Sequence, residues 1–252
     1  MPNSYTKLSA SIIFALLSTH AAALQITLAN GEWPPILGQK LPGHGYGSQI
    51  VSRAFAHQGI TVNYAFMPWR RALEATKQGQ YHGTLLWSSN PERQRDFLLS
   101  QPVYRSQTVL FYHRQQARSW RQTDSLRNAR VGVSNGYNYG ARWRSLQEQG
   151  FFTVDQANSD AQNLAKLYIQ RIDAFPCEAI VCRHLIATTL PARARTELRH
   201  DPLPVHSENM HLMLSRKTAQ SDWLLQQFNQ GLQRMRQSGE LARLLGVAQL
   251  QR

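Results

Sequence analysis

Segments that alternate like a strand and segments with the spacing of a helix follow one another along this chain, and that order limits the fold most. Residues 24–29, 61–66 and 84–87 have the composition of strands. Helical spacing fills the intervals at 46–58 and 70–78. Because a helix between successive strands connects parallel neighbours, we predict an α/β fold with a largely parallel sheet.

The same order of elements begins again after residue 105. The predicted elements of this second series are strands 109–112, 130–133, 172–175 and 211–214, and helices after Gly140, at 160–170, at 219–237 and after Gly239. The first of these strands is placed where it can leave the first sheet. A repeated start of the strand–helix pattern indicates a second α/β unit.

The N-terminus has the composition of a secretory signal peptide. Lys7 precedes a short apolar run at 8–17, and small residues follow as far as Ala23. This run is about half the roughly 20 apolar residues that a membrane-spanning helix needs. We therefore predict that residues 1–23 are a cleaved leader, with an uncleaved anchor as the alternative. The mature chain would begin at Leu24, where a lipoprotein would have cysteine, and would lie in the periplasm.

Composition fits an exported globular protein. The 229 residues after the leader (252 minus 23) suffice for one large domain or two small ones. The formal net charge is +13, with 28 Lys and Arg against 15 Asp and Glu. Because the arginines are scattered and export separates the chain from nucleic acid, we expect a basic solvated surface and no nucleic-acid partner. Anionic ligands or anionic envelope surfaces remain the alternative.

Two cysteines, Cys177 and Cys182, leave a disulfide open. An oxidising compartment and an even count favour the bond. Five residues of helix put the Cα atoms roughly 8 Å apart, and a strand puts them farther, beyond the ~7 Å that a disulfide tolerates. A disulfide therefore requires a turn between these residues.

Five short motifs occur in an order that is typical of one family. They are residues 79–83 (GQYHG), 90–97 (NPERQRDF), 100–104 (SQPVY), 130–136 (RVGVSNG) and 238–241 (SGEL). With them the chain resembles the bacterial solute-binding proteins of family 3, the periplasmic receptors of ABC transporters for polar amino acids. The resemblance covers essentially all of the mature chain.

The resemblance implies the type II periplasmic binding protein fold. Each of its two lobes is a mostly parallel sheet flanked by helices, and two hinge strands join the lobes. Lobe 1 is expected to comprise residues 24–105 and 210–252, and lobe 2 residues 106–209. Ligand would be enclosed between the lobes by closure about hinges near 104–107 and 206–210.

The resemblance also assigns polar residues to the ligand. Arg93 lies in the first turn of a helix that Asn90 and Pro91 open, and the family's arginine at this place holds the α-carboxylate. Ser88 matches a family serine that contacts the ligand. Glu178 stands where the family usually has aspartate, which accepts the α-ammonium. From the residues alone, Arg93 is also typical of a solvated surface charge, and Glu178 of a helix N-terminus.

Further expected site residues come from turns and aromatic positions. Asn138 replaces a family Thr or Ser that meets the carboxylate, and its alternative is an ordinary turn residue. Trp33 and Trp69 match the two positions that sandwich the ligand side chain, and their alternative is the core. Three neighbours complete the expected site, with Glu32 and Arg70 tuning specificity and Trp87 standing beside the serine.

Departures from the family pattern leave the ligand undecided. Leu85 and Leu86, together with Trp87, replace small residues before Ser88, and His82 replaces an aspartate in the first motif. Fewer hydroxyl groups would therefore face the ligand.

The function that the resemblance implies is non-catalytic. A monomer without metal or cofactor would capture an amino acid or a related small zwitterion or carboxylate, and would deliver it to the membrane permease of an ABC transporter. Two alternatives stay open. One is a cyclohexadienyl-dehydratase-like periplasmic enzyme on the same fold, with Glu178 or Glu32 as general acid. The other is an orphan periplasmic sensor without a permease.

Overall fold

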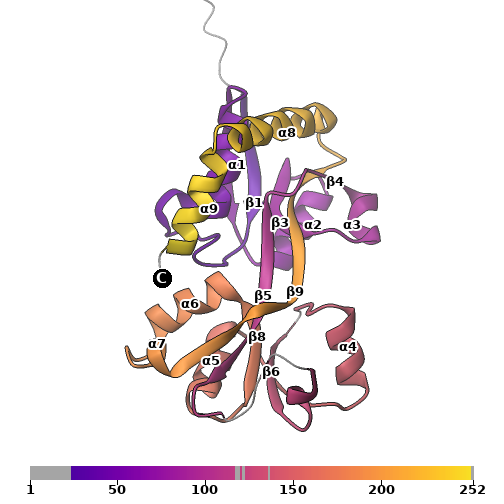
Figure 1. Cartoon of the computed structure of the whole chain (residues 1–252). Helices are drawn as coiled ribbons and strands as arrows, with labels where there is room; N and C mark the ends of the chain where they lie inside the picture. The colour runs from indigo at the N-terminus through magenta and orange to yellow at the C-terminus, as the bar shows by residue number, and fades with distance from the viewer. Residues whose placement is uncertain (1–23, 117–119, 121–122, 136, 251–252) are drawn as a thin grey trace, which may run out of the picture.

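The computed structural model describes residues 24–116, 120, 123–135 and 137–250. Within these residues, nine strands join in one sheet, in the order β2–β1–β3–β9–β5–β8–β6–β7, with β4 paired to β9 beside this path. Figure 1 shows two groups of elements, with β5 and β9 running between them. The predicted two-lobed α/β architecture is confirmed. The predicted leader, residues 1–23, lies outside the described residues.

The upper group in Figure 1 is built from both ends of the described chain. Its strands are β1 (Leu24–Asn30), β2 (Ile60–Phe66), β3 (Gly83–Ser88) and β4 (Phe97–Leu99). Its helices are η1 (Pro42–His44), α1 (Tyr46–Ala56), α2 (Trp69–Lys77), α3 (Pro91–Asp96), α8 (Ser221–Gln237) and α9 (Glu240–Leu250). β1 pairs in parallel with β2 and with β3, as the alternation of strands and helices predicts.

Helix packing closes this group around its core. α1 buries Ile50, Val51, Ala54 and Phe55, the apolar face that helical spacing gives it. α8 crosses α1 so closely that a Cβ atom on Gly231 would lie 1.8 Å from the Ala54 carbonyl oxygen. α9 is tied to the end of α1 because Glu240 pairs with Arg53 and with His57, each at 2.9 Å.

The lower group contains the middle of the chain. Its strands are β6 (Arg130–Ser134), β7 (Thr153–Ala157) and β8 (Ala174–Glu178). Its helices are η2 (Thr123–Leu126), α4 (Ala141–Glu148), α5 (Asp160–Tyr168), α6 (Ala179–Thr189) and α7 (Ala194–Glu197). β6 pairs in parallel with β7 and β8, so this part of the sheet also has the predicted parallel strands.

Two long antiparallel strands connect the groups. They are β5 (Tyr104–His113) and β9 (Leu198–Ser215). Tyr104 pairs with Met210, and the register continues from there to Thr108 opposite His206. The two segments expected to be hinges therefore lie side by side in one ladder.

Two strands have other bounds than the sequence predicts. The strand expected at 211–214 is the 18-residue β9, whose first half contains Pro202 and Pro204. Proline argues against a central strand, but it is tolerated at an edge. The strand expected at 172–175 runs instead from Ala174 to Glu178. Neither β7 nor α6 was predicted. β7 (TVDQA) is polar for a strand and lies at the edge of the sheet.

None of the helices in the described part of the chain combines the length and the apolar composition that crossing a membrane requires.

Candidate functional site

Arg93 is held against the end of β3. The Asn90 side chain accepts a hydrogen bond from the Arg93 backbone N at 2.7 Å, which begins α3 as predicted. The Nη1 group of Arg93 donates to the Ser88 carbonyl oxygen at 2.7 Å and to its Oγ at 2.8 Å. Among the described residues these are the hydrogen bonds of its guanidinium. Nε and Nη2 therefore keep N–H groups for a bidentate carboxylate.

The surroundings of this guanidinium are partly apolar and partly acidic. Its central carbon lies 4.7 Å from the centroid of the Trp87 ring, which is cation–π distance. Burial lowers the pKa of Arg93, while the negative charges of Glu208 and Glu92 act in the opposite direction. Glu208 belongs to β9 and was not among the expected site residues.

Two tryptophans form a wall beside Arg93. The Trp69 and Trp87 rings meet edge to face, with centroids 5.3 Å apart and planes at 85°. Trp69 Nε1 donates to the Glu32 carbonyl oxygen at 3.3 Å. A Cβ atom on Gly31 would lie 2.4 Å from the Trp69 ring. Only glycine at position 31 therefore lets this ring lie against the backbone. The structure thus brings Ser88, Arg93, Trp69 and Trp87 together.

The other expected residues of the first lobe lie around this cluster. Trp33 packs against the lobe 1 core and bridges to Leu37, and among the described residues it makes no ring contact with the two clustered tryptophans. Glu32 is exposed, and its Oε1 accepts from the Gln39 backbone N at 3.0 Å. Arg70 is exposed in the first turn of α2.

Asn138 lies in the turn between β6 and α4. It is exposed, and its Oδ1 accepts from the Gly140 backbone N at 3.1 Å. Gly140 has φ +90°, and a Cβ atom there would lie 2.7 Å from Nδ1 of His206. The turn therefore packs directly against hinge strand β9. A glycine is required at this contact on both steric and backbone grounds.

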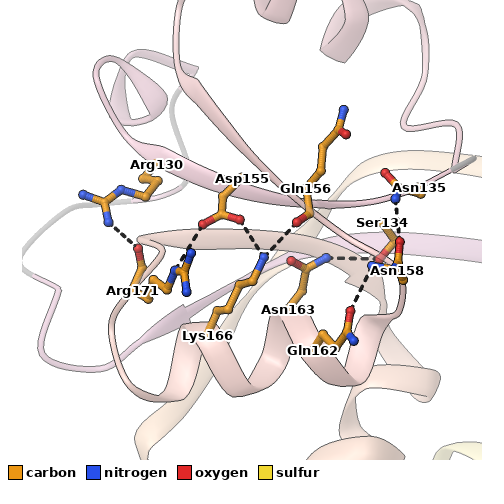
Figure 2. A network of polar contacts seen from close by, with 10 residues as sticks. All are labelled: Arg130, Ser134, Asn135, Asp155, Gln156, Asn158, Gln162, Asn163, Lys166 and Arg171. Carbon is orange, nitrogen blue, oxygen red and sulfur yellow. Dashed lines mark hydrogen bonds and ion pairs between the residues drawn. The ribbon is translucent and has the colours of Figure 1, made fainter.

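A polar network fixes the strand ends beside this turn (Figure 2). Asn135 Nδ2 donates to Asn158 Oδ1 at 2.8 Å, which joins the segment after β6 to the segment after β7. Asn163 of α5 donates to Ser134 Oγ at 3.2 Å. Farther along the helix, Lys166 pairs with Asp155 at 2.6 Å, and Lys166 is the first cause of the lowered pKa of that carboxyl.

Asp160 is a buried carboxylate that the sequence did not single out. Its Oδ1 accepts from Ser134 Oγ at 2.6 Å, and its Oδ2 accepts from the Tyr137 hydroxyl at 3.2 Å. Burial raises the pKa of this carboxyl. An acid just after the capping Ser159 is typical of any helix start, so local sequence offered no signal of its burial.

Glu178 lies at the end of β8 and is hydrogen-bonded to the hinge strand β5. Only 6% of it is exposed. The Tyr104 hydroxyl donates to its Oε1 at 2.6 Å, while Ser106 Oγ and the Gln107 backbone N donate to its Oε2 at 2.5 and 2.7 Å. Burial raises the pKa of the Glu178 carboxyl, although these hydrogen bonds oppose the shift. Glu178 thus connects lobe 2 to the hinge.

The two cysteines form a disulfide around this glutamate. Cys177 is the penultimate residue of β8, and Cys182 lies in the first turns of α6. The change from strand to helix at Glu178 brings their Cα atoms to 6.1 Å, within disulfide range. The turn that bonding required is present, and the question left open by the sequence is answered in favour of the bond.

Comparison with known proteins identifies the family and the fold. The chain matches the model of the bacterial extracellular solute-binding proteins, family 3, over residues 28–246. No curated protein sequence matches it.

Solved structures that resemble the chain include the probable amino-acid ABC transporter extracellular-binding protein ytmK from Bacillus subtilis, with TM-score 0.75, 15% identity, and coverage of 88% of this chain and 96% of that one. Another is the amino-acid ABC transporter substrate-binding protein AbpA from Streptococcus pneumoniae bound to L-arginine, with TM-score 0.67, 15% identity and coverage of 89% and 94%. A third is a histidine kinase sensor domain with similarity to periplasmic binding proteins, with TM-score 0.68, 19% identity and coverage of 89% and 96%. These likenesses confirm the type II periplasmic binding protein fold.

Proposed function

Because the chain belongs to the bacterial extracellular solute-binding proteins, family 3, we propose that it captures an amino acid or a related small zwitterion or carboxylate between its two lobes. It works in the periplasm after cleavage of residues 1–23, as a monomer, and delivers its ligand to the permease of an ABC transporter. The L-arginine bound to AbpA, which has the same fold, supports this class of ligand.

The observation that carries the proposal is the setting of Arg93. Its Nη1 group is anchored on Ser88 and its face lies on Trp87, so the guanidinium is fixed in one orientation. Fixing the fork in advance lowers the entropy lost when a carboxylate binds. Nε and Nη2 then offer the two parallel N–H groups that a carboxylate accepts.

The remaining expected residues border this carboxylate site. Trp69, beside Trp87, provides an apolar wall for the ligand side chain, and Trp33, Glu32 and Arg70 lie around it. Lobe 2 contributes Asn138 on the turn that packs against β9. The proposed lobes are residues 24–105 with 210–252, and residues 106–209, and they close about the paired hinge strands β5 and β9.

Binding proceeds without catalysis in this proposal. Glu178, the first candidate for a general acid, uses both carboxylate oxygens to hold the hinge. An acid that donates a proton to a substrate must reach that substrate. Conversion of a cyclohexadienyl amino acid by the purified protein, followed by absorbance, would contradict this part.

A ligand screen followed by two variants tests the proposal. Thermal shift with the L-amino acids, polyamines and small carboxylates identifies the ligand, because binding to the folded state raises the melting point. Calorimetry then compares Arg93→Ala with Arg95→Ala, an exposed arginine of the same short helix. We expect Arg93→Ala to weaken binding by about 30-fold to several thousand-fold. Equal affinity of the two variants would remove Arg93 from the site.

The likeness to a histidine kinase sensor domain favours one second candidate, a sensor that binds the same ligand without transporting it. Uptake of the labelled ligand by cells with and without the gene separates the two. Unchanged uptake together with a lost transcriptional response would support the sensor.

A further inference from the structure

Glu208 lies on one face of the hinge, in register with residues of the candidate site. Met210 of β9 is opposite both Ser88 of β3 and Tyr104 of β5, and Glu208 is opposite Ser106. Residues paired across antiparallel strands share a face of the sheet, and so do residues two apart on one strand. All five side chains therefore lie on one face, with Glu208 one row away from Ser88.

Glu178 belongs to the same face, but most of its acceptor positions are occupied by donors of the protein. An ionised carboxylate offers about four lone-pair positions. Tyr104, Ser106 and the backbone of Gln107 occupy three of them. With 6% of the residue exposed, a ligand ammonium would have to displace protein donors to reach it.

The carboxylate of Glu208, unlike that of Glu178, is partly exposed and is not held by hydrogen bonds from the described residues. Its side chain is 24% exposed, and its carboxylate lies 3.6 Å from Nε2 of His206. Within the described part of the chain, this carboxylate accepts no hydrogen bond. Its acceptor positions are therefore available to a ligand donor.

Arg93 and Glu208 interact through their charges but form no direct contact among the described residues. The charge of Glu208 acts on the Arg93 guanidinium, yet no ion pair joins the two side chains among the described residues. Arg93 is hydrogen-bonded to Ser88, and the row of Ser88 is about 7 Å from the adjacent row of Glu208. An α-amino acid spans such an interval when its carboxylate and its ammonium each form one hydrogen bond of about 2.8 Å at either end.

We propose that Glu208, and not Glu178, accepts the ammonium group of the ligand while Arg93 binds its carboxylate. The inference rests on the proposed function and narrows its ligand to a zwitterion whose two charges are an α-amino acid's distance apart. Glu178 keeps the place that the family gives to the ammonium acceptor, but in this chain it holds the hinge.

Paired ligands and paired variants test the assignment. The twenty L-amino acids are screened against the full-length mature protein. The tightest binder is then compared by calorimetry with the carboxylic acid that lacks its α-amino group. The variants are Glu208→Gln, Glu208→Asp, Glu178→Gln and Glu92→Gln. Glu92 is the matched control, because its charge also acts on Arg93 but it lies exposed on α3 and belongs to neither hinge strand.

We expect Glu208→Gln to lower the affinity for the amino acid by about 30-fold or more. The affinity for the acid that lacks the amino group should change by no more than about 3-fold, because Glu208 then acts only as a distant, solvent-screened charge. Glu208→Asp keeps the charge, so its affinity for the amino acid should lie between those of wild type and Glu208→Gln. Glu178→Gln and Glu92→Gln should leave the preference for the amino acid over the deaminated acid unchanged.

Several results would overturn the inference. Equal weakening of both ligands by Glu208→Gln would mean that this residue acts through Arg93 or through the fold. If Glu178→Gln lost the preference for the amino acid over the deaminated acid, Glu178 would be the residue that accepts the ammonium group. An amino acid that requires Arg93 but binds Glu208→Gln normally would refute this assignment and leave the proposed function standing. Failure of every amino acid to bind wild type would refute the inference, and failure of the small zwitterions and carboxylates as well would refute the proposed function.

Discussion

Replacing Glu178 separates its hydrogen bonds from its charge. In Glu178→Gln the amide oxygen can take the place of Oε2 and keep the bonds from Ser106 and Gln107. The amide nitrogen then takes the place of Oε1 and donates to the Tyr104 hydroxyl, which can rotate to accept. In Glu178→Ala no acceptor remains. The backbone N–H of Gln107 cannot rotate to another partner.

The two substitutions should therefore differ strongly in stability. A hydrogen bond to a charged group contributes about 1.5–3 kcal/mol and a neutral one about 0.5–1.5, so three bonds lose roughly 3 kcal/mol in Glu178→Gln. Most of this is offset because a buried charge no longer has to be desolvated. We expect Glu178→Gln to lie within about 1.5 kcal/mol of wild type, and Glu178→Ala to lose about 3–5 kcal/mol from the orphaned donors and the cavity.

The stability of wild type should also depend on pH through Glu178. Burial raises the pKa of Glu178 in the folded protein, so the folded state retains its proton longer than the unfolded state does. The free energy of unfolding of wild type should then fall as the pH rises through the ordinary glutamate pKa toward the raised one. Glu178→Gln lacks this part of the slope, so its stability relative to wild type should improve over the same interval.

Urea unfolding followed by far-UV circular dichroism, from pH 4 to pH 8, measures both effects through the midpoint at constant m-value. Glu178→Ala as stable as Glu178→Gln would refute the reasoning, because the three donors would then find other partners. A parallel pH profile for wild type and Glu178→Gln would refute the direction of the pKa shift.

Three other predictions follow from the packing. Gly231→Ala should lower the melting point by several degrees, because its Cβ would overlap a backbone carbonyl of α1 and overpacking costs about 1–3 kcal/mol; Gly246→Ala, where nothing lies within 4 Å, should not. Glu240→Gln should cost no more than about 1 kcal/mol at pH 7. Hydrogen bonding to its basic partners on α1 lowers the pKa of Glu240, so the difference from wild type should vanish as the pH falls below about 4. Thiol titration in denaturant should find no free thiol before reduction, and Cys177→Ala/Cys182→Ala should lose about 2 kcal/mol in calorimetry. Titration of two thiols, an equal loss in both glycine variants, or a Glu240→Gln difference that grows in acid would contradict these expectations.

Local sequence predicts those parts of the fold that are decided by neighbours along the chain. The strands of lobe 1 alternate or carry β-branched residues, and the start of α3 is specified by Asn90 and Pro91. β9 shows the opposite case. Its first half contains Pro202 and Pro204, which a local pattern excludes from a strand, and it becomes extended because β5 offers it a partner along most of its length.

In the candidate site, too, some residues are positioned by neighbours along the chain and others by pairing between distant strands. Arg93 was expected at the ligand from the helix start at Asn90 and from the family motif, and its contacts with Asn90 and Ser88 lie within five residues of it. The state of Glu178 was not predictable, because its donor Tyr104 is 74 residues away and the contact depends on how β5 pairs with β8. Its disulfide was undecided for a related reason, since the Cα separation depends on where the strand ends.

The same long-range register explains why a family resemblance cannot by itself identify the ammonium acceptor. A resemblance transfers roles position by position, and by position Glu178 corresponds to the family's acidic residue. Whether that carboxylate is available depends on what the hinge presents to it, and here β5 presents two hydroxyls and a backbone N–H. Once these donors occupy Glu178, a second acid on the same face is needed to balance a bound ammonium, since an unpaired charge between closed lobes is costly. β9 provides that acid in Glu208, in the row between Ser88 and Glu178.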